Sequence, residues 1–145
     1  YKDHYGKLPK SDRGNEYVLT CRDNFTRFVW LIPVKDTKSD TVVQALEENI
    51  FKYFGLVDAI ISDNARSFTS NIIKDICKKL NIDDKHTIPY CPNPNQSERV
   101  HRNLGEILRA LISENQASWD DYLAAITLAF NCAKSRATNL FHTTL

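Results

Sequence analysis

The chain has 145 residues, of which 42% are hydrophobic and 26% are charged, with only 4 glycines and 5 prolines. This composition is typical of one folded domain and excludes a linker or a disordered tail, because enough apolar residues are present to form a core. The formal net charge of +1 gives no general affinity for a polyanion, so nucleic-acid binding has to be argued from individual residues.

Targeting and cysteine patterns are those of an intracellular protein. No apolar run is long enough to span a bilayer and nothing resembles a signal peptide, so no membrane partner is expected. The four cysteines are far apart and lack the spacing of a zinc site, which favours reduced thiols. The histidines also lack ligand spacing and are assigned no metal role; they are His4, His86, His101 and His142.

The start of the chain predicts three strands. Residues 1–5 are expected to be the end of a first strand, which leads into a polar loop with glycine and proline. Residues 17–22 and 28–34 are rich in β-branched and aromatic side chains, and the polar residues 23–26 separate them. This pattern predicts a hairpin.

The middle of the chain predicts two helices and two strands. Apolar side chains recur with a helical period between Ser39, a candidate N-cap, and Gly55, a candidate stop. Residues 72–80 repeat this period, whereas the apolar run 57–61 before them predicts a buried strand. Residues 87–88 are expected to form a short last strand.

Two more amphipathic helices are predicted after the loop at residues 89–95, and the second of them begins near Trp119. The first has an apolar stripe centred on Val100, Leu104, Ile107 and Leu111, and its apolar residues at helical spacing are Val100, Leu104, Ile107, Leu108, Leu111 and Ile112. The predicted order is βββαβαβαα, in which the hairpin supplies antiparallel strands and the helical crossovers supply parallel ones. The expected fold class is therefore α/β, a mixed sheet flanked by helices.

Three acidic residues stand where strands end or a helix begins. Asp3 is expected at the end of the first strand, Asp63 directly follows the apolar run 59–62, and Glu98 lies in a first helical turn. Ligand chemistry in such folds gathers at strand ends. Taken singly, each acid has a simpler explanation, because aspartates form turns and an acid in a first helical turn interacts favourably with the helix dipole.

Several ordered motifs surround these acids. Residues 3–9 are similar to D-x-x-G-P-L-P, residues 23–27 to D-x-F-S/T-R, residues 61–68 to a second-aspartate motif, and residues 89–99 to a glutamate motif. Trp119 and residues 137–140 fit the same family ending. In this order they resemble the integrase catalytic core of the RNase H-like superfamily, especially that of gypsy-class long-terminal-repeat retrotransposons and of retroviruses, over nearly the whole chain.

The main departures from the family pattern fall in the stretch that ends at Glu98. Thirty-four residues separate Asp63 from Glu98, one fewer than in the commonest pattern, and residues 93–97 lack the usual glycine. Ala65 also stands where glycine is common. The shortened loop resembles a variant of insect-type elements, and we interpret it as a feature of that branch of the family.

The resemblance implies an RNase H-like fold with a five-stranded mixed sheet. Residues 1–145 would be the catalytic core of a longer protein, without its N-terminal zinc-binding and C-terminal DNA-binding regions. Asp3, Asp63 and Glu98 would be the catalytic residues and the ligands of two Mg²⁺ or Mn²⁺ ions, with Asp3 bridging both. The activity would be 3′-end processing and strand transfer of transposon or retroviral DNA ends into target DNA.

The resemblance also implies partners and a location: DNA as donor ends and target duplex, a homodimer or higher oligomer, and action in the nucleus. Two alternatives stay open. One is a domesticated, catalytically inactive integrase fold that serves as a nucleic-acid-binding or dimerisation module, against which the three acids argue. The other is an RNase H-like nuclease of a different family, against which the glutamate motif argues.

Five residues near Glu98 are candidates for contacts with DNA; they are Tyr90, Asn95, Gln96, Arg102 and Arg109. The first three are polar residues in or next to the loop before the helix. The two arginines fall within about 40° of the Glu98 direction on the helix and would form a basic ridge for backbone phosphates. The alternative is a polar loop followed by a solvated helix face.

Overall fold

The computed structural model describes residues 2–62, 71–86 and 95–132, with backbone only for residue 86 and residues 95–98. The strands are β1 (Lys2–Tyr5), β2 (Tyr17–Arg22), β3 (Val29–Val34), β4 (Ala59–Ser62) and β5 (Asp83–His86). The helices are α1 (Ser39–Leu46), α2 (Lys52–Phe54), α3 (Asn71–Lys79), α4 (Asn95–Glu114) and α5 (Leu123–Cys132). A π-helical turn joins α1 to α2, and a 3₁₀ turn (Trp119–Tyr122) precedes α5. The predicted order of elements is confirmed.

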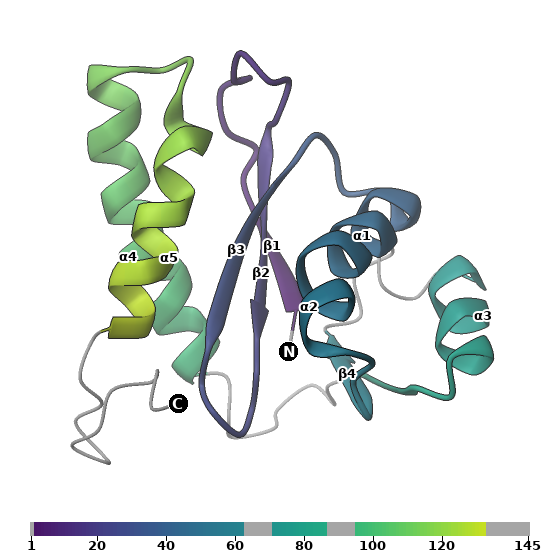
Figure 1. Cartoon of the computed structure of the whole chain (residues 1–145). Coiled ribbons are helices and arrows are strands. Elements are labelled where there is room, and N and C mark those ends of the chain that lie inside the picture. The colour runs from purple at the N-terminus through teal and green to yellow at the C-terminus, as the bar shows by residue number, and fades with distance from the viewer. Residues whose placement is uncertain (1, 63–70, 87–94, 133–145) are drawn as a thin grey trace.

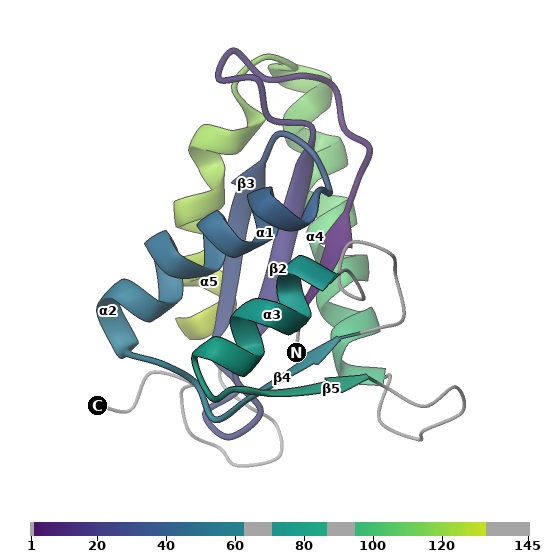
Figure 2. The same cartoon turned by 90° about the vertical axis from the view of Figure 1, so that its right-hand side faces the viewer.

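The five strands form one mixed sheet in the order β3-β2-β1-β4-β5. The pairs β1–β2 and β2–β3 are antiparallel, and the pairs β1–β4 and β4–β5 are parallel, as the connections predicted. Figures 1 and 2 show α4 and α5 on one face of this sheet and α1, α2 and α3 on the other. The strand β1, which carries Asp3, is therefore central and covered on both faces.

Each face of the sheet has its own core, and β2 contributes to both because its side chains alternate. Leu19 and Cys21 pack with α1 and α3, whereas Val18 packs with α4 and α5. On the second face Leu104, Leu108, Trp119, Leu123 and Ile126 are buried. None of the helices in the described ranges is long and apolar enough to cross a membrane.

Long-range hydrogen bonds fix the ends of these elements. Ser11 and Asn15, in the loop after β1, donate to the buried Asp120 carboxylate over 2.6 and 2.7 Å. The Trp119 indole donates to the carbonyl of Pro9 over 2.7 Å, so the loop is tied to the segment before α5. At the other end of α5, the amide of the buried Asn131 exchanges two hydrogen bonds of 2.8 Å with the backbone of Val29.

Of three local predictions, one is wrong, one is confirmed and one lies outside the described residues. Ser39 is the first residue of α1 and not its N-cap, because the Asp36 carboxylate accepts from the Lys38 amide and the Thr41 hydroxyl. Gly55 does end the helical run, with φ of 81°. The fifth strand is β5, whereas the predicted strand at 87–88 lies outside the described residues. Its sequence, DDKH, has no apolar alternation because charged residues suit an edge strand.

Most of the apolar residues predicted at helical spacing in α4 lie on its inner face, because Val100, Leu104, Leu108, Leu111 and Ile112 belong to the second core. Leu104 and Leu108 are fully buried, whereas Ile107 is 38% exposed. His101, Leu104 and Leu108 are three and four positions apart, so they lie together on the inner face of α4. Gly105 is buried beside this face and lies against the side chain of Tyr5.

Candidate active site

Asp3 occupies the middle of the sheet. Its backbone is paired with Thr20 of β2, and Lys2 just before it is paired with Ser62 at the end of β4. The prediction that Asp3 ends the first strand is wrong, because pairing with β2 continues to Tyr5. Neighbours in register share a face of the sheet, so Asp3 and Thr20 both face α4 while Lys2 and Cys21 face α1.

The Asp3 carboxylate is 27% exposed and contacts the backbone of His4 and the side chain of His101. One oxygen, Oδ1, accepts a hydrogen bond of 2.7 Å from the backbone amide of His4. The other, Oδ2, lies 3.6 Å from Nδ1 of His101, whose side chain is 20% exposed. The His101 ring in turn packs edge-on against Tyr5, with ring centroids 6.0 Å apart.

The contact with His101 brings Asp3 to the first turns of α4. This helix begins at Asn95, and Glu98 lies three residues before His101, about 4.5 Å along the helix axis. The structure thus brings Asp3 close to the helical turn that carries Glu98. The side chain of Glu98 lies outside the described part of the chain, so its role stays a prediction.

Asp63, the third predicted ligand, lies outside the described residues. It follows Ser62, which is fully buried and ends the strand next to β1. Within the described ranges 2–62, 71–85 and 99–132, no group of three or more His, Cys, Asp or Glu side chains could hold a metal ion. Only Asp3 among the three acids has a described side chain, so the meeting of all three stays a prediction.

The polar atoms around Asp3 are compatible with one edge of a site for a hard cation. A carboxylate oxygen is a ligand that Mg²⁺ prefers. Thr20 Oγ1 and His101 Nε2 are buried, and in the part of the chain that the structure describes neither atom has a hydrogen-bond partner. Such orphaned polar atoms are uncommon in a core, and an ion or a water that completes the site is one explanation for them.

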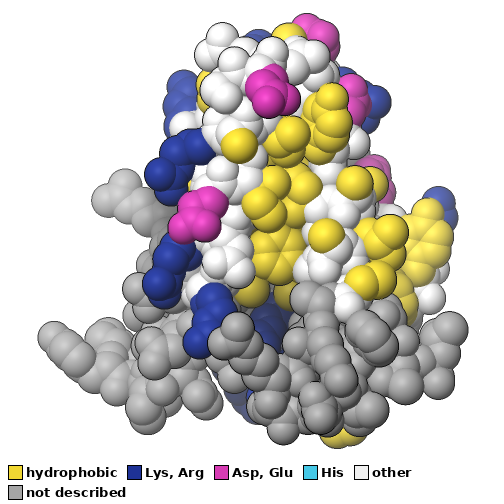
Figure 3. All heavy atoms as spheres, turned by 90° about the vertical axis from the view of Figure 1, so that its left-hand side faces the viewer, with side chains coloured by type: hydrophobic (Ala, Val, Ile, Leu, Met, Phe, Trp, Pro, Cys, Tyr) yellow, Lys and Arg dark blue, Asp and Glu magenta, His cyan; other side chains and the backbone are white. Residues whose placement is uncertain are grey.

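The predicted DNA contacts are only partly described. Tyr90 and the side chains of Asn95 and Gln96 lie outside the described residues, although Asn95 and Gln96 form the first turn of α4. Arg102 and Arg109 are exposed, as their positions on the helix predicted. Arg109 donates through Nε to the carbonyl of Gly105 over 3.1 Å. Figure 3 shows basic side chains along one margin of the α4–α5 surface, beside an apolar strip.

Two residues beside Asp3 were missed from the sequence. The prediction that His101 has no metal role stays a prediction, but its position three residues after Glu98 was a usable signal for its contact with Asp3. Thr20 could not be found without the register of β1 against β2.

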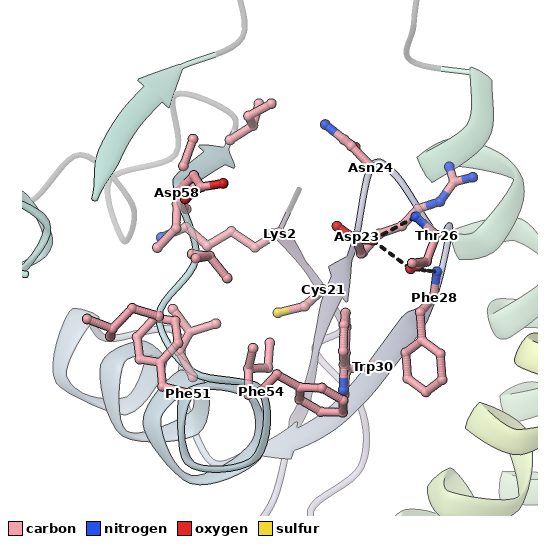
Figure 4. Close-up of a pocket in the computed structure, with 18 residues that line it drawn as sticks. Lys2, Cys21, Asp23, Asn24, Thr26, Phe28, Trp30, Phe51, Phe54 and Asp58 are labelled. Atoms are coloured by element: carbon pink, nitrogen blue, oxygen red, sulfur yellow. Dashed lines mark hydrogen bonds between the residues drawn. The ribbon is translucent and has the colours of Figure 1, made fainter. Parts of the chain in front are cut away.

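A separate cavity of about 650 Å³ lies on the opposite face of the sheet (Figure 4). Lys2 and Cys21 line it from the sheet, and Trp30 and Phe54, in ring contact at 5.5 Å, line it farther out. Burial raises the pKa of the Cys21 thiol to about 12. Because Lys2 and Cys21 point away from Asp3, this cavity is distinct from the candidate active site.

Comparisons with known proteins identify the family and the fold. A polyprotein from transposon 412 of Drosophila melanogaster, described as retrovirus-related, is 33% identical over 94% of the chain, which spans 11% of that relative's length. The catalytic core of BIV integrase has a TM-score of 0.71 at 22% identity, over 92% of this chain and 83% of that one. The HTLV-2 integrase core, solved in complex with magnesium in a trimeric form, has a TM-score of 0.73 at 14% identity. The match covers 98% of this chain and 89% of that one.

These two solved structures are catalytic cores of retroviral integrases and share the mixed five-stranded sheet with flanking helices, the RNase H-like fold. The sequence model of the integrase core domain matches residues 5–92, more than half of the 145 residues. The chain therefore belongs to the integrase core domain family.

Proposed function

We propose that this chain catalyses metal-dependent processing and joining of DNA ends, with Asp3, Asp63 and Glu98 as the catalytic carboxylates. The observation that carries the proposal is the contact of Asp3, on the central strand, with the first turns of the helix that bears Glu98. Asp63 is one peptide step, about 3.8 Å between Cα atoms, from Ser62 on the adjacent strand. The three acidic side chains would therefore start from neighbouring backbone positions, from which they could meet in a single site.

The carboxylates of Asp3, Asp63 and Glu98 would hold two Mg²⁺ or Mn²⁺ ions. When bound, such ions activate the attacking water or 3′-hydroxyl and stabilise the leaving oxygen of an in-line displacement. The residues would contribute charge and orientation, because β1 is paired with β2 at Asp3 and with β4 at the neighbouring Lys2. The magnesium bound to the HTLV-2 core supports this assignment by similarity of fold.

The DNA would approach over the start of α4. Arg102 is exposed there, and we propose that it contacts backbone phosphates of the donor end or the target duplex. Tyr90, Asn95, Gln96 and Arg109 are proposed to flank it. We further propose that the chain is the core of a longer integrase, acts in the nucleus and assembles as a dimer or larger oligomer.

The test is Mg²⁺-dependent joining of a labelled donor end to target DNA, by the chain and by the longer integrase proposed to contain it. Asp3→Asn and Glu98→Gln should abolish joining, a loss of several orders of magnitude, because each removes a charge that holds a cation. The free energy of unfolding of Glu98→Gln should change by less than about 1 kcal/mol, because less repulsion between the acids offsets the lost interaction with the helix dipole.

The matched control is Glu106→Gln, an equal change at an exposed position on the same helix, which should leave joining intact. Joining that survives Glu98→Gln would remove Glu98 from the site. A folded wild-type protein that binds DNA but joins no ends with Mg²⁺ or Mn²⁺ would favour the domesticated, inactive alternative.

A further inference from the structure

Thr20 faces the same side of the sheet as Asp3, directly opposite it in the antiparallel pair β1–β2. Only 4% of Thr20 is exposed, and its hydroxyl makes no hydrogen bond in the part of the chain that the structure describes. Leaving a buried hydroxyl without a partner lowers stability, and valine would suit this strand position at least as well. The hydroxyl therefore has no evident role in the fold itself.

His101 approaches Asp3 from the opposite direction, from α4. Its Nδ1 lies 3.6 Å from Asp3 Oδ2, within ion-pair range but longer than a hydrogen bond. Its Nε2 is buried and also lacks a partner among the described residues. The ring packs against Tyr5 on the inner face of α4, and within the described ranges it makes no direct hydrogen bond.

Both groups are within reach of the Asp3 carboxylate. Directly opposed side chains in an antiparallel pair have Cβ atoms about 4.5–5.5 Å apart, so rotation about one side-chain bond can join the Thr20 hydroxyl to a carboxylate oxygen. A shift of a few tenths of an ångström brings His101 Nδ1 into hydrogen-bond range. A carboxylate that gives one oxygen to a cation could accept from these donors with its other oxygen.

We propose that Thr20 and His101 are positioning residues, which hold the Asp3 carboxylate in the orientation that presents an oxygen to the cation. The inference rests on the proposed function, in which Asp3 is a metal ligand. Thr20 acts from β2 and His101 from α4, so the two side chains steady the carboxylate from the sheet and from the helix.

The test is calorimetric titration of the full chain with Mn²⁺ or Mg²⁺ in the absence of DNA. Thr20→Val keeps the shape but removes the hydroxyl, and it should raise the metal Kd about ten- to a hundredfold, the usual effect of removing a group that orients a ligand. Thr20→Ser keeps the hydroxyl and should stay within about threefold of wild type. Without metal, the melting temperature of Thr20→Val should equal or exceed that of wild type, because an orphaned polar atom is removed.

His101 is tested by a matched pair of substitutions. His101→Phe keeps a ring against Tyr5 but has no donor, so it should weaken metal binding to a similar extent. His101→Asn places an amide nitrogen at about the position of Nδ1 and should recover most of the affinity. If His101 had a purely structural role, His101→Asn would be less stable than His101→Phe and would bind the metal no more tightly.

The outcomes separate this inference from the proposed function. If wild type binds the cation and Asp3→Asn abolishes binding, but Thr20→Val and His101→Phe bind as wild type does, the positioning role is wrong and the metal site stands. If wild type binds no cation, or Asp3→Asn binds as tightly as wild type, the metal site fails and the inference fails with it.

Discussion

The packing of α4 on β1 can be tested at Gly105 by substitution with alanine. A Cβ atom at this buried position would lie 2.5 Å from the hydroxyl oxygen of Tyr5 and 3.2 Å from its Cζ. Tyr5 ends β1, two residues after Asp3, and its ring packs against His101. Gly105→Ala therefore pushes on the contact that brings α4 to Asp3.

Two opposing effects set the magnitude. In a helix interior, replacing glycine with alanine alone stabilises by roughly 1 kcal/mol. Relieving the overlap with the Tyr5 ring, which is packed against the core, should cost about 1–3 kcal/mol. The net expectation for Gly105→Ala is a free energy of unfolding between unchanged and about 2 kcal/mol lower.

Tyr5→Phe supplies the control because it removes the atom in closest contact and leaves the 3.2 Å approach to Cζ. Urea unfolding of wild type, both single variants and the double variant gives a coupling energy, which should be at least about 1 kcal/mol in favour of the double variant. Metal titration of the same proteins should show weaker binding for Gly105→Ala. This account of the packing would be refuted if Gly105→Ala stabilised both the wild-type protein and the Tyr5→Phe variant by about 1 kcal/mol and left metal binding unchanged.

Three other predictions concern separate parts of the chain. Asp120→Ala should lower the free energy of unfolding by about 2–4 kcal/mol in urea, because it removes the acceptor of two hydrogen bonds from the loop after β1; Asp120→Asn should lose less. Burial raises the pKa of the Cys21 thiol from 9.0 to about 12, so the unfolded chain loses this proton at lower pH than the folded chain. The free energy of unfolding should therefore fall by up to ~1.4 kcal/mol per pH unit above pH 9, and Cys21→Ala should remove this slope. Arg102→Ala should weaken binding to all DNA sequences alike and reduce the slope of log K against log salt by about 0.9, whereas Lys78→Ala on α3 should leave the slope unchanged.

The elements that sequence patterns predicted are those with strong periodicity. The helical runs begin and end close to the predicted positions because each buries one apolar face against the sheet. The antiparallel and parallel pairings followed from the connections alone. The edge strand β5 was misplaced because its backbone pairs with β4 while its side chains follow no apolar pattern.

The site was predictable only to the level of single residues. Motifs singled out Asp3, and the structure puts it on the central strand beside α4. Its neighbours Thr20 and His101 depend on a strand register and on helix docking, which no local pattern encodes. The exposure of Ile107, which the helical period placed among the apolar positions of α4, has the same origin, since packing against the sheet sets the rotation of the helix.

Asp3 and Glu98 reach the proposed site by different routes, and this difference governs how mutations should act. Asp3 is held by strand pairing on both sides of β1, so a change in helix packing leaves its backbone in place. The first turns of α4, where Glu98 lies, depend on the burial of Leu104 and Leu108 and on the close approach at Gly105. Metal affinity should therefore respond to changes in α4 packing that touch no carboxylate, whereas changes at the far edge of the sheet should affect stability alone.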